Sequence, residues 1–214
     1  MGARHKIVLG LGNPGSEYDG HRHNVGAGVV AELARDWGWR EGGRTRLYWE
    51  VHGERDGVDV MLVRSRTYMN ETGRAVTALL AATRVEPADL LVVLDDWQLP
   101  LGKVRFRARG SDGGHKGLRS VLGALGVEEL PRCRIGIGVP VGESVDFVLS
   151  SFTREEREAL IPARPRVKEA IDCWLRDGTE AAMNRYNHQE PVAGDGAALD
   201  RDRTKKITGA RKEP

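Results

Sequence analysis

Short apolar runs alternate with helix-like segments along most of the chain, and this alternation constrains the fold more than any other feature. After its first residue, Asp89–Leu94 is continuously apolar, as in a strand covered on both faces. Ile7–Gly12 is also strand-like, whereas Asn24–Trp37 carries apolar residues at helical spacing. We therefore expect an α/β fold, in which a single globular domain holds a mixed, largely parallel twisted sheet flanked by helices.

Further strand signals lie on either side of these segments. Leu47–His52 and Val58–Val63 enclose a Gly-Glu-Arg-Asp-Gly turn, which predicts an antiparallel hairpin at one side of the sheet. Lys103–Arg109 alternates basic residues with small or apolar ones, and Arg132–Val139 is apolar enough for another strand. Strand signals therefore continue beyond the central strand.

The later part of the chain is predominantly helix-like. A glycine-rich stretch over 110–117 precedes a predicted helix, and Thr153–Tyr186 is expected to be helical with interruptions at Pro162 and Pro165. We assign residues 1–188 to the α/β domain and expect the polar residues 189–214 to be a disordered basic tail.

Charge and composition limit the class of protein. The chain has 214 residues and a net charge of +2, but Arg201–Pro214 alone holds six basic and two acidic residues. A basic tail is compatible with RNA binding, and it is equally compatible with a solvated end. The chain has no apolar run of the roughly 18–20 residues that a membrane span requires. We expect a cytoplasmic protein without membrane association, with Cys133 and Cys173 reduced, half-buried and not bound to metal.

Three polar residues follow predicted strands or the turns after them. They are Asn13, Asn70 and Asp95. The carboxyl ends of parallel strands meet at one crevice, where such folds bind ligands. Each residue also has a structural interpretation, because Asn13 suits a turn, Asn70 suits the start of the next helix, and Asp95 suits a loop. Their coincidence favours a site.

Two histidines lie close to this crevice in the sequence. His23 stands at the start of the first helix and His21 lies two residues before it, and spacing alone does not distinguish them. A neutral imidazole oriented by Asp95 suits the removal of a proton from water. The chain has no Gly-x-Ser-x-Gly sequence, and neither cysteine lies in a catalytic motif, so water is the favoured nucleophile.

Two further motifs concern phosphate. Gly10–Gly15 matches Gly-x-Gly-x-x-Gly, but Pro14 interrupts the turn and no acidic residue ends a second strand at the expected distance, which disfavours a dinucleotide site. Basic residues surround the later half of the crevice: Lys103, Arg105, Arg107, Arg109, Lys116, Arg119 and Arg134. They suit a phosphate backbone, and a solvated basic strand face is the alternative.

Several of these segments resemble one known family, the bacterial-type peptidyl-tRNA hydrolases. Val8–Tyr18 and Arg22–Gly26 resemble the N-terminal signature, and Thr67–Gly73 resembles the second. The third is matched by Asp95-Asp96, Leu99-Pro100, Gly102 and Gly113–Arg119, and Arg134–Gly138 and Trp174–Gly178 extend the match. The resemblance covers about residues 6–187 in order.

The resemblance implies an enzyme that cleaves the ester between peptide and tRNA, and it assigns roles to individual residues. His23 would be the catalytic base and Asp95 its partner. Asn13 and Asn70 would position the peptide and the ester, and His115 would lie in a mobile glycine-rich lid. Tyr18, Tyr68 and Lys116 are grouped with the substrate-binding residues, and Arg105, Arg107 and Arg134 with those that hold tRNA phosphate. The family also implies a monomer with no metal or cofactor and with peptidyl-tRNA as its partner.

This chain departs from the family pattern at several positions. Lys116 stands where the family usually has asparagine, and Ser65 replaces a usual proline. Leu94 and Trp97-Gln98 alter the surroundings of Asp95. The departures concern rate and substrate positioning. An RNA-binding paralogue of the same fold with weak or no hydrolysis is the main alternative, and a nicotinamide-dependent dehydrogenase is a distant third.

Overall fold

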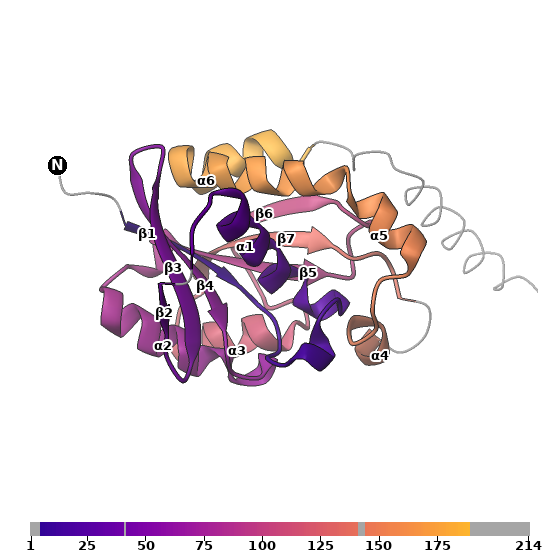
Figure 1. Cartoon of the computed structure of the whole chain (residues 1–214), viewed down its shortest axis with the longest axis horizontal. Coiled ribbons are helices and arrows are strands. Elements are labelled where there is room, and N and C mark those ends of the chain that lie inside the picture. The colour runs from indigo at the N-terminus through magenta and orange to yellow at the C-terminus, as the bar shows by residue number, and fades with distance from the viewer. Residues whose placement is uncertain (1–4, 41, 141–143, 189–214) are drawn as a thin grey trace, which may run out of the picture.

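A computed structural model describes residues 5–40, 42–140 and 144–188, which form one sheet with helices on both faces (Figure 1). The seven strands run in the order β2-β3-β4-β1-β5-β7-β6. They are β1 His5–Gly10, β2 Gly43–Arg44, β3 Tyr48–Arg55, β4 Val58–Ser65, β5 Leu90–Asp96, β6 Val104–Arg109 and β7 Glu129–Gly136. The mixed α/β sheet predicted from the sequence is confirmed.

Six α-helices and four short 3-10 helices accompany these strands in the described part of the chain, and α4 to α6 follow the last strand. The α-helices are α1 Val25–Asp36, α2 Thr72–Thr83, α3 Lys116–Leu125, α4 Ser144–Val148, α5 Arg154–Leu160 and α6 Ala163–Tyr186. The 3-10 helices are η1 Ser16–Tyr18, η2 Arg22–Asn24, η3 Met69–Glu71 and η4 Pro87–Asp89. The sequence predicted neither α4 nor β2, because segments of five and two residues are too short to show a period.

The centre of the sheet is parallel and its two sides are antiparallel. β4, β1, β5 and β7 run parallel, which places the ends of β1, β5 and β7 at one edge. The predicted hairpin is confirmed as β3 and β4, and β6 adds a second antiparallel pairing at the opposite side. Ligand sites of open α/β sheets lie outside the carboxyl ends of parallel strands.

Strand β5 is buried along its whole length, as its continuous apolar sequence predicts. Leu91 and Val93 contribute to the hydrophobic cluster that includes α1 and α6, and Val92 and Leu94 contribute to the cluster that includes α2 and α3. Burying one such side chain stabilises a fold by about 1.5–3 kcal/mol. The sandwich of two helical layers therefore fixes β5, and with it the position of Asp95 at its end.

Helix α1 crosses the sheet at very short range because two glycines lie in the contact. A Cβ at Gly10 would lie 2.4 Å from the carbonyl oxygen of Gly26, and a Cβ at Gly26 would lie 2.2 Å from that of Val93. Only glycine leaves room for the backbones to approach this closely. The contact brings η2, the short turn before α1, against the carboxyl end of β5.

The long helix α6 differs from the prediction in one respect. Pro162 separates α5 from α6 as expected, but Pro165 lies in the first turn of α6 and does not interrupt it. The first turn has no intrahelical N–H bond to lose, so proline is tolerated there. The helix is instead broken at Gly178, whose φ of 87° and ψ of −177° are not helical.

The buried Lys6 side chain packs against this broken segment of α6. Its ammonium group donates hydrogen bonds to the carbonyl oxygens of Trp174 and Leu175, at 2.9 and 3.0 Å. These carbonyls lie four and three residues before the break at Gly178, where the regular ladder of helical hydrogen bonds is lost. The amine of Lys6 therefore satisfies both of them, and it ties β1 to the middle of α6.

The end of α6 also meets the outer strand β6. Asn187 accepts a hydrogen bond from the N–H of Phe106 at 2.7 Å and donates one to its carbonyl oxygen at 3.1 Å. One amide side chain therefore pairs with both backbone groups of Phe106 on the outer side of β6.

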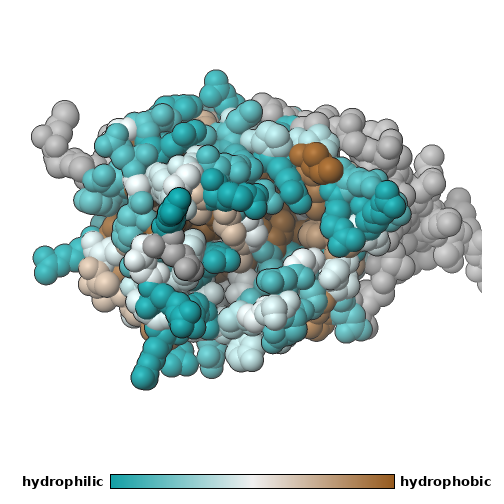
Figure 2. Space-filling view, viewed as in Figure 1, coloured by the Kyte–Doolittle hydropathy of each residue, from teal (hydrophilic) through white to brown (hydrophobic). Residues whose placement is uncertain are grey.

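Both cysteine side chains are buried. Cys133 and Cys173 are 0% and 1% exposed, so the expectation of half-buried thiols is wrong. Burial raises the pKa of the Cys133 thiol far above its ordinary value. The face in Figure 2 is mostly hydrophilic. Within the described residues, no helix has both the length and the apolar character to cross a bilayer. The predicted tail, 189–214, lies outside the described residues.

Candidate active site

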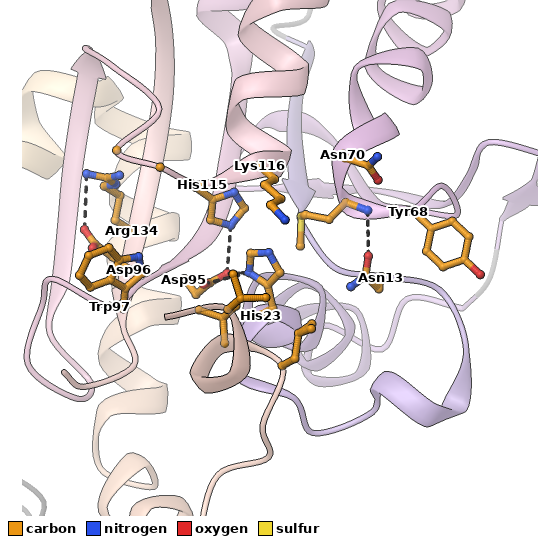
Figure 3. Close-up of a pocket in the computed structure, with 16 residues that line it drawn as sticks. Asn13, His23, Tyr68, Asn70, Asp95, Asp96, Trp97, His115, Lys116 and Arg134 are labelled. Atoms are coloured by element: carbon orange, nitrogen blue, oxygen red, sulfur yellow. Dashed lines mark hydrogen bonds and ion pairs between the residues drawn. The ribbon is translucent and has the colours of Figure 1, made fainter. Parts of the chain in front are cut away.

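A pocket of about 360 Å³ lies at the carboxyl edge of the sheet, between the ends of β1 and β5 and the start of α3 (Figure 3). It brings together eight of the residues singled out from the sequence: Asn13, His23, Tyr68, Asn70, Asp95, His115, Lys116 and Arg134. These residues come from segments spread over more than half of the chain. The crevice expected at the strand ends is therefore present.

His23 and Asp95 form a buried pair at the base of this pocket. Nδ1 of His23 lies 2.9 and 3.0 Å from the two carboxylate oxygens of Asp95. The side chains are 10% and 1% exposed. An ionised carboxylate only accepts hydrogen bonds, so Nδ1 carries the proton and donates it. Nε2 of His23 is then the unprotonated nitrogen, with a lone pair that can accept a proton.

The geometry also distinguishes the two histidines that spacing left equivalent. His23 lines the pocket, whereas His21 does not. His21 instead forms a backbone bridge with Ser151, and its ring packs edge-on against Tyr18, with 5.6 Å between the ring centroids. Tyr18 likewise lies outside the pocket lining.

His115 lines the pocket from the N-cap of α3 and is 7% exposed. Its contacts with Leu118 and Asp95 were not predicted from the sequence. Its Nδ1 accepts a hydrogen bond from the N–H of Leu118 at 3.1 Å, and its Nε2 lies 3.0 Å from Asp95. Because Nδ1 is an acceptor, the ring proton is on Nε2 and is donated to the carboxylate.

Asp95 therefore accepts hydrogen bonds from two imidazoles at once. Burial alone would raise the pKa of the Asp95 carboxyl, but the charge and hydrogen bonds of His115 and His23 outweigh burial and hold the pKa far below its ordinary value. The carboxylate stays ionised over the physiological pH range as a result.

The same three side chains form the one cluster of potential metal ligands in the described part of the chain. The hydrogen bond from Leu118 decides how His115 uses its ring nitrogens. Because that bond keeps the proton on Nε2, the nitrogen that faces Asp95 is a donor and not a free metal ligand. The cluster is therefore best described as a hydrogen-bonded histidine–aspartate–histidine group.

Three hydrogen bonds hold Asn13 in place. The side chain of Asn24 bonds both the N–H and the carbonyl oxygen of Asn13, each at 2.9 Å. Oδ1 of Asn13 accepts the N–H of Met69 at 2.8 Å, which joins the loop after β1 to the start of η3. The Nδ2 amide remains as the donor that Asn13 can offer within the pocket.

Asn70 and Tyr68 line the opening of the pocket and are exposed to solvent. Asn70 lies in the middle of η3, and its side chain caps neither η3 nor α2, so the expectation that it caps the next helix is wrong. Helix α2 instead begins after Glu71. The amide of Asn70 is therefore left available at the mouth of the pocket.

Two cationic side chains, those of Lys116 and Arg134, line the pocket. Lys116 is the first residue of α3, and its side chain extends into the pocket beside His115 (Figure 3). Arg134 is held in place, because its Nη1 lies 3.4 Å from a carboxylate oxygen of Asp96 and its Nη2 donates to the carbonyl of Asp112 at 3.4 Å. Asp96 therefore offsets the charge of Arg134.

The other two predicted phosphate-binding residues lie beside the pocket and not in it. Arg105 is the cross-strand partner of Arg134, and Arg107 is the partner of Arg132. Cross-strand partners share one face of a sheet, so Arg105, Arg107 and Arg134 lie on a common basic face. Arg132 is only 1% exposed, and its guanidinium group donates to backbone carbonyl oxygens instead. Burial, followed by the charges of Arg105 and Arg134, lowers the pKa of Arg107.

An apolar wall of the pocket was not predicted from the sequence. Val145, Val148 and Leu149 belong to α4 or directly follow it, and they line the side next to His23. Their i, i+3, i+4 spacing is the signal that was available, but it covers only one helical turn. Met69, between Tyr68 and Asn70, was also overlooked and lines the same cavity.

A histidine–carboxylate pair at the carboxyl edge of a mixed α/β sheet is an arrangement suited to an enzyme that uses general acid–base catalysis, as ester hydrolases do. Comparison with known proteins narrows this class, because the family model of peptidyl-tRNA hydrolase matches residues 7–193. The chain belongs to the peptidyl-tRNA hydrolase family.

Individual relatives agree with this assignment. The peptidyl-tRNA hydrolase of Symbiobacterium thermophilum is 44% identical over 186 residues, which cover 85% of this chain and 98% of the relative. That of Carboxydothermus hydrogenoformans is 46% identical, with 85% and 97% coverage. The crystal structure of the Acinetobacter baumannii peptidyl-tRNA hydrolase superposes with a TM-score of 0.78 at 31% identity, covering 87% of this chain and 96% of that one. A peptidyl-tRNA hydrolase in complex with N-propanol gives a TM-score of 0.81 at 30% identity, with 87% and 96% coverage.

Proposed function

We propose that this protein is an enzyme that hydrolyses the ester between a peptide and the 3′ end of tRNA, and so releases the tRNA for reuse. The observation that carries the proposal is the buried His23–Asp95 pair, which leaves one imidazole nitrogen unprotonated within the pocket. We also propose that it acts in the cytoplasm as a monomer and uses neither a metal nor a cofactor.

In this mechanism water is the nucleophile and His23 is the general base. Nε2 takes a proton from water as the water oxygen bonds to the ester carbonyl carbon. The tetrahedral intermediate then collapses, the bond from carbon to the ribose oxygen breaks, and the imidazolium returns the proton to that oxygen. Asp95 orients the ring of His23 and stabilises its positive charge during the reaction.

His115 supports this pair without touching the substrate and is therefore a positioning residue. Its hydrogen bond to Asp95 leaves the carboxylate less freedom to rotate away from His23. Its bond from Leu118 also anchors the base of the pocket to the first turn of α3. The two bonds preorganise the base before substrate arrives, which lowers the reorganisation needed during catalysis.

The remaining pocket residues align the acyl group. Asn13 and Asn70 offer amide donors to the ester and the first peptide bond, and Tyr68 contacts the substrate at the opening. Lys116 faces the reacting carbonyl, where an ammonium group stabilises the oxygen that becomes negative in the intermediate. The apolar wall formed by Val148 and Leu149 packs against the side chain of the residue linked to tRNA.

The tRNA lies on the basic side of the pocket in this proposal. Arg134 lines the pocket, and Arg105 and Arg107 continue the positive surface along β6. Guanidinium groups bind phosphate through paired N–H donors, which suits a nucleic acid backbone. The ester then lies between the basic surface and Asn13.

A binding protein of the same fold with little turnover is the second candidate, and Lys116 is the observation that favours it. A lysine at this position can bind phosphate as well as an oxyanion. In that case the wild-type protein would bind tRNA without cleaving the ester, and Lys116→Asn would be the first change to restore cleavage.

The decisive experiment measures release of an N-blocked amino acid from its tRNA by the wild-type protein and by His23→Ala. Cleavage by the wild type that is lost in the variant supports the hydrolase and its base together. Binding of the same tRNA by both proteins, without cleavage by either, would replace the enzyme with the RNA-binding alternative.

A further inference from the structure

A second hollow, of about 500 Å³, lies next to the active-site pocket and shares Asn13 with it. Its walls are the loop after β1, the first turns of α1 and the facing ends of β2, β3 and β4. The side towards α1 is formed largely by Gly12, Ala27, Gly28 and Ala31, whose side chains are at most a methyl group. The hollow, which we call the arginine groove, is thus a direct continuation of the active site.

Three guanidinium groups line the arginine groove. They belong to Arg44, Arg64 and Arg66, and Asp19 is the only acidic residue among the described residues of the lining. Arg44 pairs across the sheet with Trp49, and Trp49 pairs with Arg64. Cross-strand partners share one face, so Arg44, Trp49 and Arg64 form a row across β2, β3 and β4. Arg66 follows the end of β4, two residues beyond Arg64.

Packing on Trp49, in the middle of this row, holds Arg64 at its β4 end. The guanidinium carbon of Arg64 lies 4.3 Å from the centre of the Trp49 ring, which is a cation–π contact. Trp49 itself is 8% exposed and belongs to the hydrophobic core. The positive charge of Arg64 is therefore fixed on the groove wall instead of moving freely in solvent.

The groove and the basic surface lie at opposite ends of the active site. In Figure 3, Arg134 is on one side of His23 and Asn13 is on the other. If tRNA phosphates occupy the Arg134 side, as in the proposed function, the peptide leaves the ester in the direction of Asn13. The next space along that path is the arginine groove.

We propose that the arginine groove binds the part of the peptide remote from the ester and selects carboxylate side chains there. The inference rests on the proposed function. Neighbouring strands lie about 4.8 Å apart, so the row from β2 to β4 spans about 10 Å, the length of roughly three extended residues. Acidic residues in such a segment meet Arg44 at one end and Arg64 and Arg66 at the other.

The test compares three substrates that share one tRNA and one ester-linked residue. The first carries only the N-blocked amino acid, the second a longer peptide with three glutamates remote from the ester, and the third the same peptide with glutamines. We expect the wild-type KM for the glutamate substrate to be about fivefold lower than for the glutamine substrate, since each exposed ion pair contributes modestly. The kcat values should agree.

The variant for this test is Arg44→Gln combined with Arg66→Gln, because both side chains are exposed and Arg64 can stay on Trp49. It should lose the preference for glutamate and keep the wild-type rate on the N-blocked amino acid. Arg35→Gln is the matched control, since Arg35 is exposed on α1 and lies outside the groove lining, and it should keep the preference.

Two results would overturn the proposal. One is an equal KM of the wild type for the glutamate and glutamine substrates. The other is weaker binding of uncharged tRNA by the double variant, which would make the groove an RNA site. Failure to cleave the N-blocked amino acid would instead refute the proposed function. Binding of the free labelled peptides to the protein would then be measured by fluorescence anisotropy. Tighter binding of the glutamate peptide supports the proposal for the groove, and equal binding of the two peptides refutes it.

Discussion

Nδ1 of His23 faces both carboxylate oxygens of Asp95, at 2.9 and 3.0 Å. This contact fixes which nitrogen of His23 is protonated, and it makes the opposite nitrogen the base. Replacing either residue therefore has a defined consequence for turnover.

His23→Ala should lower kcat by about 10²–10⁴-fold, the usual contribution of a general base, and leave the fold intact. Release of an N-blocked amino acid from tRNA measures the rate, and circular dichroism measures the fold. His21→Ala is the matched control and should stay near the wild-type rate, because His21 lies outside the pocket lining. A near-normal rate in His23→Ala would remove His23 from the mechanism.

Asp95→Asn should lower kcat by about 10²–10⁴-fold, because an amide no longer holds His23 in the required tautomer. It should also destabilise the fold by about 1–3 kcal/mol at pH 7, because one of two buried N–H donors loses its acceptor.

The stability effect of Asp95 depends on pH in a defined direction. The pKa of Asp95 in the folded protein lies below its ordinary value of 3.8. Its contribution to the free energy of unfolding is therefore fully present above pH 3.8 and is lost as the pH falls through the lowered pKa. Urea unfolding of wild type and Asp95→Asn from pH 3 to 7 should show a constant difference at the upper end that shrinks at the lower end. A difference that grows on acidification contradicts this account.

His115 has two roles that substitutions can separate. His115→Ala removes the N-cap of α3 and should cost about 0.5–2 kcal/mol of stability. Asparagine is a good N-cap but is too short to replace the imidazole bond to Asp95, so His115→Asn should recover much of the stability while turnover stays low. Thermal unfolding and kcat of both variants test this. Recovery of both quantities in His115→Asn would reduce His115 to a helix cap.

Two substitutions at Lys116 separate the contribution of its charge to kcat from that of its hydrogen-bond donor. Lys116→Met removes the donor and should lower kcat by about 10–10²-fold, somewhat less than loss of a well-placed oxyanion donor. Lys116→Asn keeps a neutral donor and should fall between Lys116→Met and wild type. Single-turnover cleavage with saturating protein separates the chemical step from tRNA binding. Equal rates in all three proteins would show that Lys116 does not face the reacting carbonyl.

The close crossing of α1 over the sheet gives a matched pair of glycine substitutions. Gly26→Ala should destabilise the protein by about 1–3 kcal/mol or more, because the added Cβ would lie 2.2 Å from a backbone oxygen. Gly28→Ala, in the same helix, meets open space and should stabilise the protein by about 0.4–1 kcal/mol. Chemical denaturation of both variants measures the contrast, and a Gly26→Ala protein as stable as wild type would contradict the packing.

Periodicity predicted the parts of the fold in which many residues repeat one pattern. The buried strand β5, the hairpin of β3 and β4 and the helix α1 were all expected from their sequences. The break at Gly178 was not, because a single glycine within a helical pattern is usually tolerated, whereas the prolines attracted attention. Whether Pro165 disrupts the helix depends on whether it lies in the first turn, and that depends on where the helix begins.

The sequence predicted only part of the candidate site. Strand ends place Asn13 and Asp95 at a common edge, so their proximity follows from topology. The position of His115 on Asp95 does not, because it requires the loop after β6 to return across the end of β5. The contacts of Asn24 with Asn13 also depend on how closely η2 packs against the sheet. Such tertiary contacts have no local sequence period.

The pairing of Asn187 with Phe106 affects whether molecules of this protein can associate through the edge strand β6. An outer strand normally offers N–H and C=O groups to any extended chain that approaches, and this is a route to strand-by-strand polymerisation. On β6 the amide of Asn187 already binds both groups of the central residue. A foreign strand would have to displace that side chain before it could add to the sheet, so the residue that caps the C-terminus of α6 also protects this edge of the sheet against aggregation.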